Sequence, residues 1–189
     1  LFRSLGKALA DDQFSTDDRE RLIHSHGQTT TDEVSRVLYG NLARTVDLVV
    51  WPESEDDCVA VVNLARDHNV CLIPYGGGTN VSDALQIPES ETRMVVSLDM
   101  RRMDAIEWLD AENLTACVQA GILGGRLEEL LAEQGFTCGH EPDSIELSTL
   151  GGDPEVARMM GEDVRFQSDI NPSRRLVFLG KAAIYSAGA

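Results

Sequence analysis

A run of three glycines, Gly76–Gly78, comes two residues after a short apolar segment, Val70–Ile73, and constrains this chain more than any other feature. Glycine weakens a strand, because it has no side chain to pack and loses much conformational freedom on folding. A triple glycine at the end of a strand is therefore typical of a place where the main chain approaches a ligand closely or adopts positive φ angles. Successive N–H groups exposed in such a turn form an anion-binding nest. We expect a pyrophosphate to bind there.

Two familiar nucleotide motifs do not fit these glycines. The dinucleotide fingerprint needs a third glycine where Val81 stands, and no helical pattern begins there. The P-loop needs Gly-Lys-Ser/Thr, which Val81-Ser82-Asp83 does not supply. A simpler interpretation is that Gly76–Gly78 only connects two elements. Local composition alone leaves the ligand-binding and connecting interpretations about equal.

The residues before the glycines predict a strand–helix–strand unit. Asp47–Trp51 is a compact apolar run ended by Pro52, which indicates a buried strand. Ser54 can cap a following helix whose first turn is acidic. Four apolar residues are expected on one face of this helix: Cys58, Val61, Val62 and Ala65. The second strand, Val70–Ile73, then leads directly into Pro74.

After the glycines, strands prevail over helices. We expect strands at Met94–Leu98, Ile106–Leu109 and Leu114–Gln119. An amphipathic helix follows at Gly124–Gln134, and Gly135 ends it. Its inward residues are expected to be Leu127, Leu130 and Leu131, and its outward residues Glu128, Glu129 and Glu133. Because strands outnumber helices between residues 90 and 120, the sequence predicts an α+β fold.

The two ends of the chain are less regular. Residues 1–45 are expected to form an N-terminal helical segment, in which Ser15 and Asp18 indicate a capping box for a short helix ending near His24–Gly27. Residues 29–44 fit either a loop or a helix. Residues 153–189 form a divergent tail with no assignable order of elements, and their one good apolar run is Leu176–Leu179.

The composition limits the partners of this chain. Its formal charge of −16 argues against nucleic acid, which needs a basic face. Main-chain N–H groups can still hold a phosphorylated ligand without net positive charge. Every apolar run is too short to span a membrane. Four widely spaced cysteines indicate a reducing compartment: Cys58, Cys71, Cys117 and Cys138. Four histidines lack a recognised metal spacing, and we expect no metal: His24, His26, His68 and His140.

A second polar stretch runs from Gly139-His140-Glu141-Pro142-Asp143-Ser144 to Ser148-Thr149-Leu150-Gly151-Gly152. Standing alone, it is more typical of a solvated loop. Together with Pro74–Asn80, named the glycine loop, it resembles the FAD-binding domain of the vanillyl-alcohol-oxidase / p-cresol-methylhydroxylase (PCMH) class of flavoproteins. Within that class it is most similar to the alkyldihydroxyacetone-phosphate synthase (alkylglycerone-phosphate synthase) family, over about residues 15–152.

The resemblance implies an FAD-binding PCMH-type domain over residues 46–152, built of two small α/β subdomains and incomplete in this chain. It implies that one group of residues wraps the FAD pyrophosphate: Pro74, Tyr75, Gly76, Gly77, Gly78, Thr79 and Asn80. A second group would form another wall of the cofactor site: Asp143, Ser144, Ile145, Glu146, Leu147, Ser148 and Thr149. The family's further flavin contacts and substrate domain have no counterpart after Gly152. We therefore expect a fragment that cannot complete catalysis alone, and assign it no catalytic residue.

The implied reaction exchanges the acyl chain of acyl-dihydroxyacetone phosphate for a fatty alcohol, a transferase step in ether-lipid biosynthesis. One alternative is FAD-dependent oxidation of a 2-hydroxy acid, as by a D-lactate dehydrogenase, and another is a catalytically inactive, truncated flavin-binding domain. Gly139–Ser144 favours the synthase. Peripheral membrane contact and a homodimer stay open as further partners. The resemblance implies a peroxisome or glycosome, although Ser186–Ala189 is not a Ser-Lys-Leu type signal.

Overall fold

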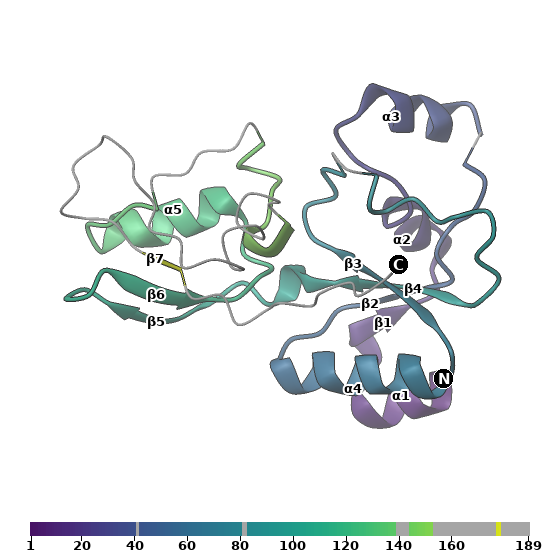
Figure 1. Cartoon of the computed structure of the whole chain (residues 1–189), viewed down its shortest axis with the longest axis horizontal. Helices are drawn as coiled ribbons and strands as arrows, with labels where there is room; N and C mark the ends of the chain where they lie inside the picture. The colour runs from purple at the N-terminus through teal and green to yellow at the C-terminus, as the bar shows by residue number, and fades with distance from the viewer. Residues whose placement is uncertain (41, 81–82, 139–143, 153–176, 179–189) are drawn as a thin grey trace. The chain divides into compact units, whose positions relative to one another are not determined.

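The computed structural model of this chain describes residues 1–40, 42–80, 83–138, 144–152 and 177–178. It divides into two compact units, Leu1–Arg102 and Met103–Ala189. Each unit combines α-helical structure with its own β-sheet, as Figure 1 shows. This is the predicted α+β arrangement. The boundaries predicted at residues 45/46 and 152/153 stay predictions.

The first unit is built on a four-stranded sheet whose order is β1-β2-β4-β3. Its strands are β1 (Phe14–Ser15), β2 (Leu48–Val50), β3 (Cys71–Tyr75) and β4 (Val95–Asp99). β1 runs antiparallel to β2, whereas β2, β4 and β3 are mutually parallel. The parallel register pairs Val50 and Pro74 with Leu98, and Tyr75 with Asp99. The carboxyl ends of the three parallel strands therefore meet at one edge of the sheet.

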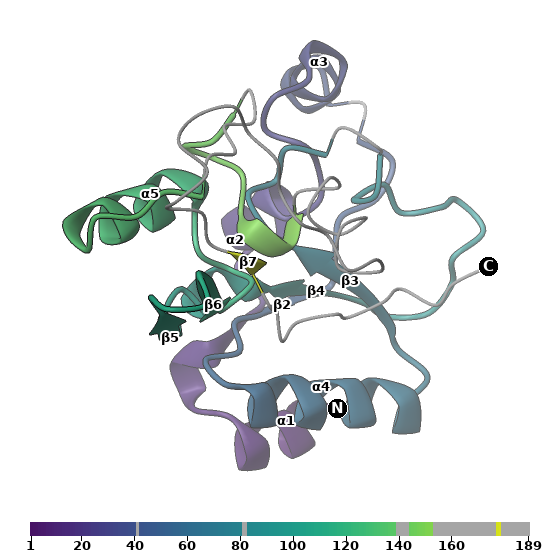
Figure 2. The ribbon, with the colours of Figure 1, turned by 60° about the vertical axis from the view of Figure 1, so that its left-hand side comes forward.

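One face of this sheet is covered by α4 (Glu55–Asp67), beside which α1 (Phe2–Ala8) lies, as Figure 2 shows. The predicted cap is confirmed, because the Ser54 hydroxyl accepts the N–H of Asp57 at 3.2 Å. The predicted inner face is correct for three residues: Cys58, Val61 and Ala65 are buried. It is wrong for Val62, which is 41% exposed. Val62 lies about 100° around the helix from Val61, outside the narrow stripe that contacts the sheet.

The opposite face of the sheet carries a core cluster of seven buried residues: Val46, Val49, Ile73, Tyr75, Leu85, Ile87 and Val95. Two further helices belong to this unit, α2 (Asp18–Ile23) and α3 (Thr31–Leu38). The residue that caps α2 is Asp17, whose carboxylate accepts the N–H groups of Arg19 at 2.9 Å and Glu20 at 3.3 Å. The predicted cap at Ser15 is therefore wrong; its hydroxyl accepts the N–H of Asp17 at 3.0 Å.

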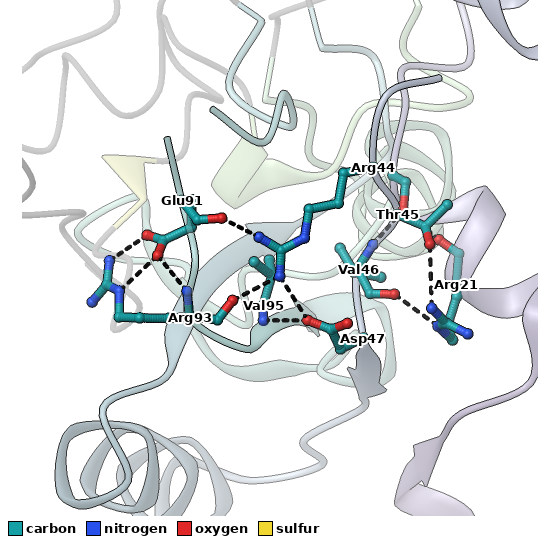
Figure 3. Close-up of polar contacts among 9 residues, drawn as sticks. Arg21, Arg44, Thr45, Val46, Asp47, Glu91, Arg93 and Val95 are labelled. Atoms are coloured by element: carbon teal, nitrogen blue, oxygen red, sulfur yellow. Dashed lines mark hydrogen bonds and ion pairs between the residues drawn. The ribbon is translucent and has the colours of Figure 1, made fainter. Parts of the chain in front are cut away.

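Two arginines secure the amino ends of β2 and β4, as Figure 3 shows. The guanidinium of Arg44 donates to Asp47 at 3.1 Å and to the carbonyl of Arg93 at 2.7 Å. Asp47 in turn accepts the N–H of Val95 at 2.8 Å. Arg21 of α2 donates to the carbonyl of Val46 at 2.8 Å. These contacts fix the starts of the strands and leave their carboxyl ends for the glycine loop.

The second unit packs a helix, α5 (Gly124–Glu133), on a small sheet. Strands β5 (Ile106–Asp110) and β6 (Thr115–Val118) are antiparallel, and β7 (Val177–Phe178) pairs parallel with β6. Leu127 and Leu131 of α5 are buried and Leu130 packs against the same core, as predicted. Glu128 was expected to point outward, but it accepts the hydroxyl of Thr137 and the N–H of Cys138, both at 2.9 Å. It therefore closes the turn that follows α5.

Three short 3-10 turns complete the described elements: Asp11–Gln13, Met100–Arg102 and Leu150–Gly152. None of the helices within the described ranges is long and apolar enough to cross a bilayer.

Candidate functional site

The glycine loop leaves the carboxyl edge of the first sheet. β3 ends at Tyr75 and is the last strand in the sheet order, so Pro74 needs no N–H for a further partner strand. Tyr75 is buried, Pro74 is exposed, and Gly76–Asn80 follow directly. In open α/β sheets, ligands bind outside the carboxyl ends of parallel strands. The loop occupies such a position.

The main-chain N–H groups of this loop are not used in hydrogen bonds to described residues. Within the described part of the chain, no acceptor is paired with the N–H of Gly76, Gly77, Gly78, Thr79 or Asn80. Among the three glycines, Gly78 alone has a positive φ, 69°, and Asn80 follows it at 48°. Gly78 also has no room for a side chain, because a Cβ there would lie 2.3 Å from the hydroxyl of Tyr75. Consecutive free N–H groups fit the oxygens of a diphosphate.

A segment far away in the sequence holds the other side of the loop. The N–H of Gln28 donates to the carbonyl of Gly78 at 2.6 Å, and the hydroxyl of Thr29 donates to the carbonyl of Thr79 at 2.8 Å. The side-chain amide of Asn80 donates to Glu33, and its oxygen accepts the N–H of Leu85 at 2.9 Å. Sequence reasoning missed these contacts, because residues 29–44 show no pattern that points to the loop.

The carboxylate of Glu33 is buried and ionised. Burial is the largest single influence and raises its pKa, but hydrogen bonds from Thr30, Gly27 and Asn80 and the charge of His26 outweigh it and lower the pKa overall. The N–H of Gly27 donates to the Glu33 carboxylate at 2.8 Å, and the hydroxyl of Thr30 donates to the same carboxylate at 2.6 Å. A buried carboxylate with three donors is a rigid anchor.

A second buried carboxylate, Asp99, lies at the same edge of the sheet. Its carboxylate accepts hydrogen bonds from the imidazole of His24 at 2.8 Å, the indole N–H of Trp51 at 2.9 Å and the guanidinium of Arg101 at 2.6 Å. The rings of His24 and Tyr75 are 4.4 Å apart, and the Arg101 guanidinium lies 5.2 Å from the centre of the Tyr75 ring. These contacts fix Tyr75, the last residue of β3, from which the glycine loop departs.

The second predicted stretch belongs to the other unit. Asp143 lies outside the described residues, and Ser144–Thr149 pack against the segment that leads into α5. The N–H groups of Gly124 and Gly125 donate to the carbonyls of Ser148 and Ile145 at 2.9 and 3.1 Å.

Within this stretch, Glu146 and Leu147 are exposed and Thr149 is buried. The hydroxyl of Thr149 has no hydrogen-bond partner among the described residues. Among the described residues, a buried hydroxyl without a partner therefore ends a partly exposed turn, and the role of each residue in cofactor binding stays a prediction.

The described residues offer the site no metal centre. No cluster of three or more histidine, cysteine or acidic side chains occurs among them in a geometry that could hold a metal ion. The site as described offers main-chain amides and hydroxyls.

Comparison with known proteins identifies the type of domain. The model of an FAD binding domain family matches residues 46–156. An alkyldihydroxyacetonephosphate synthase of Caenorhabditis elegans is 52% identical over 139 residues, which are 74% of this chain and 23% of the relative. A mitochondrial D-lactate dehydrogenase [cytochrome] of Arabidopsis thaliana is 27% identical over 130 residues, 69% of this chain and 21% of the relative.

A solved structure of an alkyldihydroxyacetonephosphate synthase superposes with a TM-score of 0.76 at 42% identity, covering 80% of this chain and 28% of that one. The chain thus spans about a quarter of the length of the curated synthases that it matches. The fold and the cofactor, FAD, agree with the sequence analysis. The chain belongs to the family of FAD binding domains, with alkyldihydroxyacetonephosphate synthases as relatives at 43–52% identity.

Proposed function

We propose that this chain is the flavin-binding part of an alkyldihydroxyacetonephosphate synthase. The complete protein would exchange the acyl chain of acyl-dihydroxyacetone phosphate for a fatty alcohol in ether-lipid biosynthesis. The observation that carries this proposal is the difference in similarity. The synthase of Caenorhabditis elegans is 52% identical over 139 residues, whereas the D-lactate dehydrogenase of Arabidopsis thaliana is 27% identical over 130.

The residues of this chain would bind and orient the cofactor. The N–H groups of Gly76–Asn80, which have no acceptor among the described residues, suit the diphosphate of FAD, and Asp143–Thr149 would supply a second wall. FAD, when bound, supplies the reactive flavin ring, and the protein contributes its position and surroundings. The residues that contact the alcohol and the phosphorylated substrate would belong to the rest of the complete protein.

The experiment is an activity assay on the complete protein that contains this chain. It is purified, its flavin absorbance is recorded, and it is incubated with acyl-dihydroxyacetone phosphate and a long-chain fatty alcohol. Formation of the alkyl ether product, with release of the fatty acid, is the expected result. The same preparation is mixed with D-lactate as the alternative substrate. Flavin bleaching by D-lactate without ether formation would instead assign a 2-hydroxy-acid oxidoreductase.

The third alternative, an inactive flavin-binding domain, requires a separate measurement. The 189-residue chain alone is purified and titrated with FAD, and its absorbance and flavin fluorescence are followed. We expect retention of FAD without ether synthesis. Failure of the complete protein to take up FAD would overturn the cofactor assignment itself.

Location and assembly extend the proposal. We place the complete protein in peroxisomes, or in glycosomes where these exist, with peripheral membrane contact and a homodimeric state as further expectations. Fractionation of the source cells against a peroxisomal matrix marker tests the location. Light scattering of the purified protein tests the dimer, and sedimentation with phospholipid vesicles tests membrane contact.

A further inference from the structure

We infer that Glu33 is a positioning residue for the flavin diphosphate, because it anchors a segment that turns the N–H groups of the glycine loop toward the ligand. The segment, Gly27–Glu33, is named here the brace. The inference rests on the glycine loop holding the FAD diphosphate, and it is independent of the reaction that follows.

The direction of the loop amides follows from the planarity of the peptide bond. In a trans peptide unit, the carbonyl of one residue and the N–H of the next point in opposite directions. The carbonyl of Gly78 points to the N–H of Gln28 at 2.6 Å, so the N–H of Thr79 points away from the brace. The carbonyl of Thr79 points to the hydroxyl of Thr29 at 2.8 Å, so the N–H of Asn80 also points away. The brace thus donates hydrogen bonds to the carbonyls of Gly78 and Thr79, and the N–H groups of Thr79 and Asn80 point away from it, where an anion could bind.

Glu33 is the point at which the brace is joined to the loop. One carboxylate oxygen accepts the N–H of Gly27 at 2.8 Å and the side-chain amide of Asn80. The other oxygen accepts the hydroxyl of Thr30 at 2.6 Å. The side chain therefore ties both ends of the brace and the last residue of the loop to a single buried group.

The close approach of the brace explains a second glycine. A Cβ on Gly27 would lie 2.1 Å from a carboxylate oxygen of Glu33 and 2.7 Å from the Cβ of Asn80. Asn80 itself has a positive φ of 48° and accepts the N–H of Leu85 at 2.9 Å. Leu85 belongs to the buried core cluster, so the orientation of the loop is connected to the core through Glu33 and Asn80.

The test compares four variants in the complete protein, with FAD and ADP as ligands. ADP carries the diphosphate without the flavin ring. Glu33→Ala removes all three acceptor contacts, and we expect the Kd for FAD and for ADP to rise by the same factor, about tenfold or more. Glu33→Gln can keep the three contacts: its oxygen accepts from Gly27 and Asn80, and its amide donates to Thr30. We expect its Kd to stay within about threefold of the wild type.

The matched control is Asp32→Ala on the same helix. Asp32 is exposed and forms an ion pair with Arg36 at 2.6 Å, so its removal should leave both Kd values unchanged. Thr29→Val covers the case in which Glu33→Ala fails to fold. It removes one exposed hydrogen bond to the loop, and we expect about a threefold rise in both Kd values with an unchanged circular dichroism spectrum.

Two results would overturn the role of Glu33: folded Glu33→Ala protein with wild-type Kd values, or a loss in Glu33→Gln as large as in Glu33→Ala. If Glu33→Ala does not fold, unchanged Kd values in Thr29→Val would overturn the role of the brace, and with it that of Glu33. A wild-type protein that binds neither FAD nor ADP would instead remove the cofactor assignment on which the inference rests.

Discussion

The Nε2 atom of His24 lies 2.8 Å from Oδ2 of Asp99, and solvent reaches neither side chain. His24 follows α2, whereas Asp99 is the last residue of β4, so this contact joins the helix to the carboxyl edge of the sheet. Trp51 and Arg101 donate to the same carboxylate. Asp99 therefore holds together the carboxyl edge of the sheet, where the glycine loop departs from β3.

Replacing Asp99 by Asn should destabilise the protein and change its response to acid. Burial is the largest single influence and raises the pKa of Asp99, but hydrogen bonds from His24 and Arg101 and the Arg101 charge lower it overall, from 3.8 to about 2. The folded protein therefore binds this proton less readily than the unfolded chain does. Ionised Asp99 contributes about 2 kcal/mol above pH 4, and this is lost as the pH falls from 3.8 toward 2.

We expect Asp99→Asn to cost about 3 kcal/mol at pH 7, because an amide N–H₂ would face buried donors. Urea unfolding at pH 7, 5 and 3 measures this. The difference between the wild type and Asp99→Asn should shrink at pH 3, because part of the Asp99 contribution is then lost. A difference that stays constant from pH 7 to 3 would contradict the lowered pKa.

Replacing Gly78 by Ala should weaken FAD binding, and Gly40→Ala is a matched control. Both glycines have φ of 69°, so both alanines carry a backbone cost of about 1 kcal/mol. A Cβ at Gly40 meets nothing within 4 Å, whereas at Gly78 it would lie 2.3 Å from the Tyr75 hydroxyl. We expect Gly78→Ala alone to raise the Kd for FAD, by about tenfold or more. Equal Kd values for the two variants, measured by flavin fluorescence, would show that the close contact is unimportant.

Sequence reasoning succeeded where the physical signal is local. The glycine loop directly follows its strand, and Ser54 caps a helix only three residues away, at Asp57. It failed where two local solutions compete, because Ser15 and Asp17 both carry side chains that can accept hydrogen bonds near the start of α2. The choice of Asp17 depends on the exact residue at which the helix begins.

The contacts that organise the site are not local, and the sequence does not reveal them. Glu33 and Asn80 are 47 residues apart, and His24 and Asp99 are 75 apart. Each residue alone is compatible with an exposed loop or helix surface. Burial of these acidic side chains follows from donors that only the folded chain brings together. Resemblance to a family located the cofactor loop, but it did not indicate its supports.

The thiol of Cys58 should resist alkylation in the folded protein. Burial is the main cause that raises its pKa from 9.0 to about 11, with the charges of Asp57 and Glu55 adding to it. The thiolate fraction at pH 8 is therefore about a hundredfold lower than for an ordinary thiol. We expect iodoacetamide to label the half-buried Cys71 first, and Cys58 only after urea is added. Peptide mass spectrometry gives the order, and labelling of Cys58 as fast as Cys71 in native protein would contradict the prediction.

The packing of Ser144–Thr149 on the start of α5 can be tested with two neighbouring glycines. A Cβ on Gly124 would lie 2.7 Å from the Ile145 side chain and 3.1 Å from its carbonyl, whereas a Cβ on Gly125 meets its nearest atom at 4.0 Å. We expect Gly124→Ala to lower the free energy of unfolding by about 1–3 kcal/mol through overpacking. Gly125→Ala should be neutral or stabilise the helix by up to about 1 kcal/mol.

Because the displaced turn is the proposed second wall of the cofactor site, Gly124→Ala should also weaken FAD binding, whereas Gly125→Ala should not. Urea unfolding and FAD titration of both variants decide this, and equal behaviour of the two alanines would mean that the turn does not pack on α5 as described.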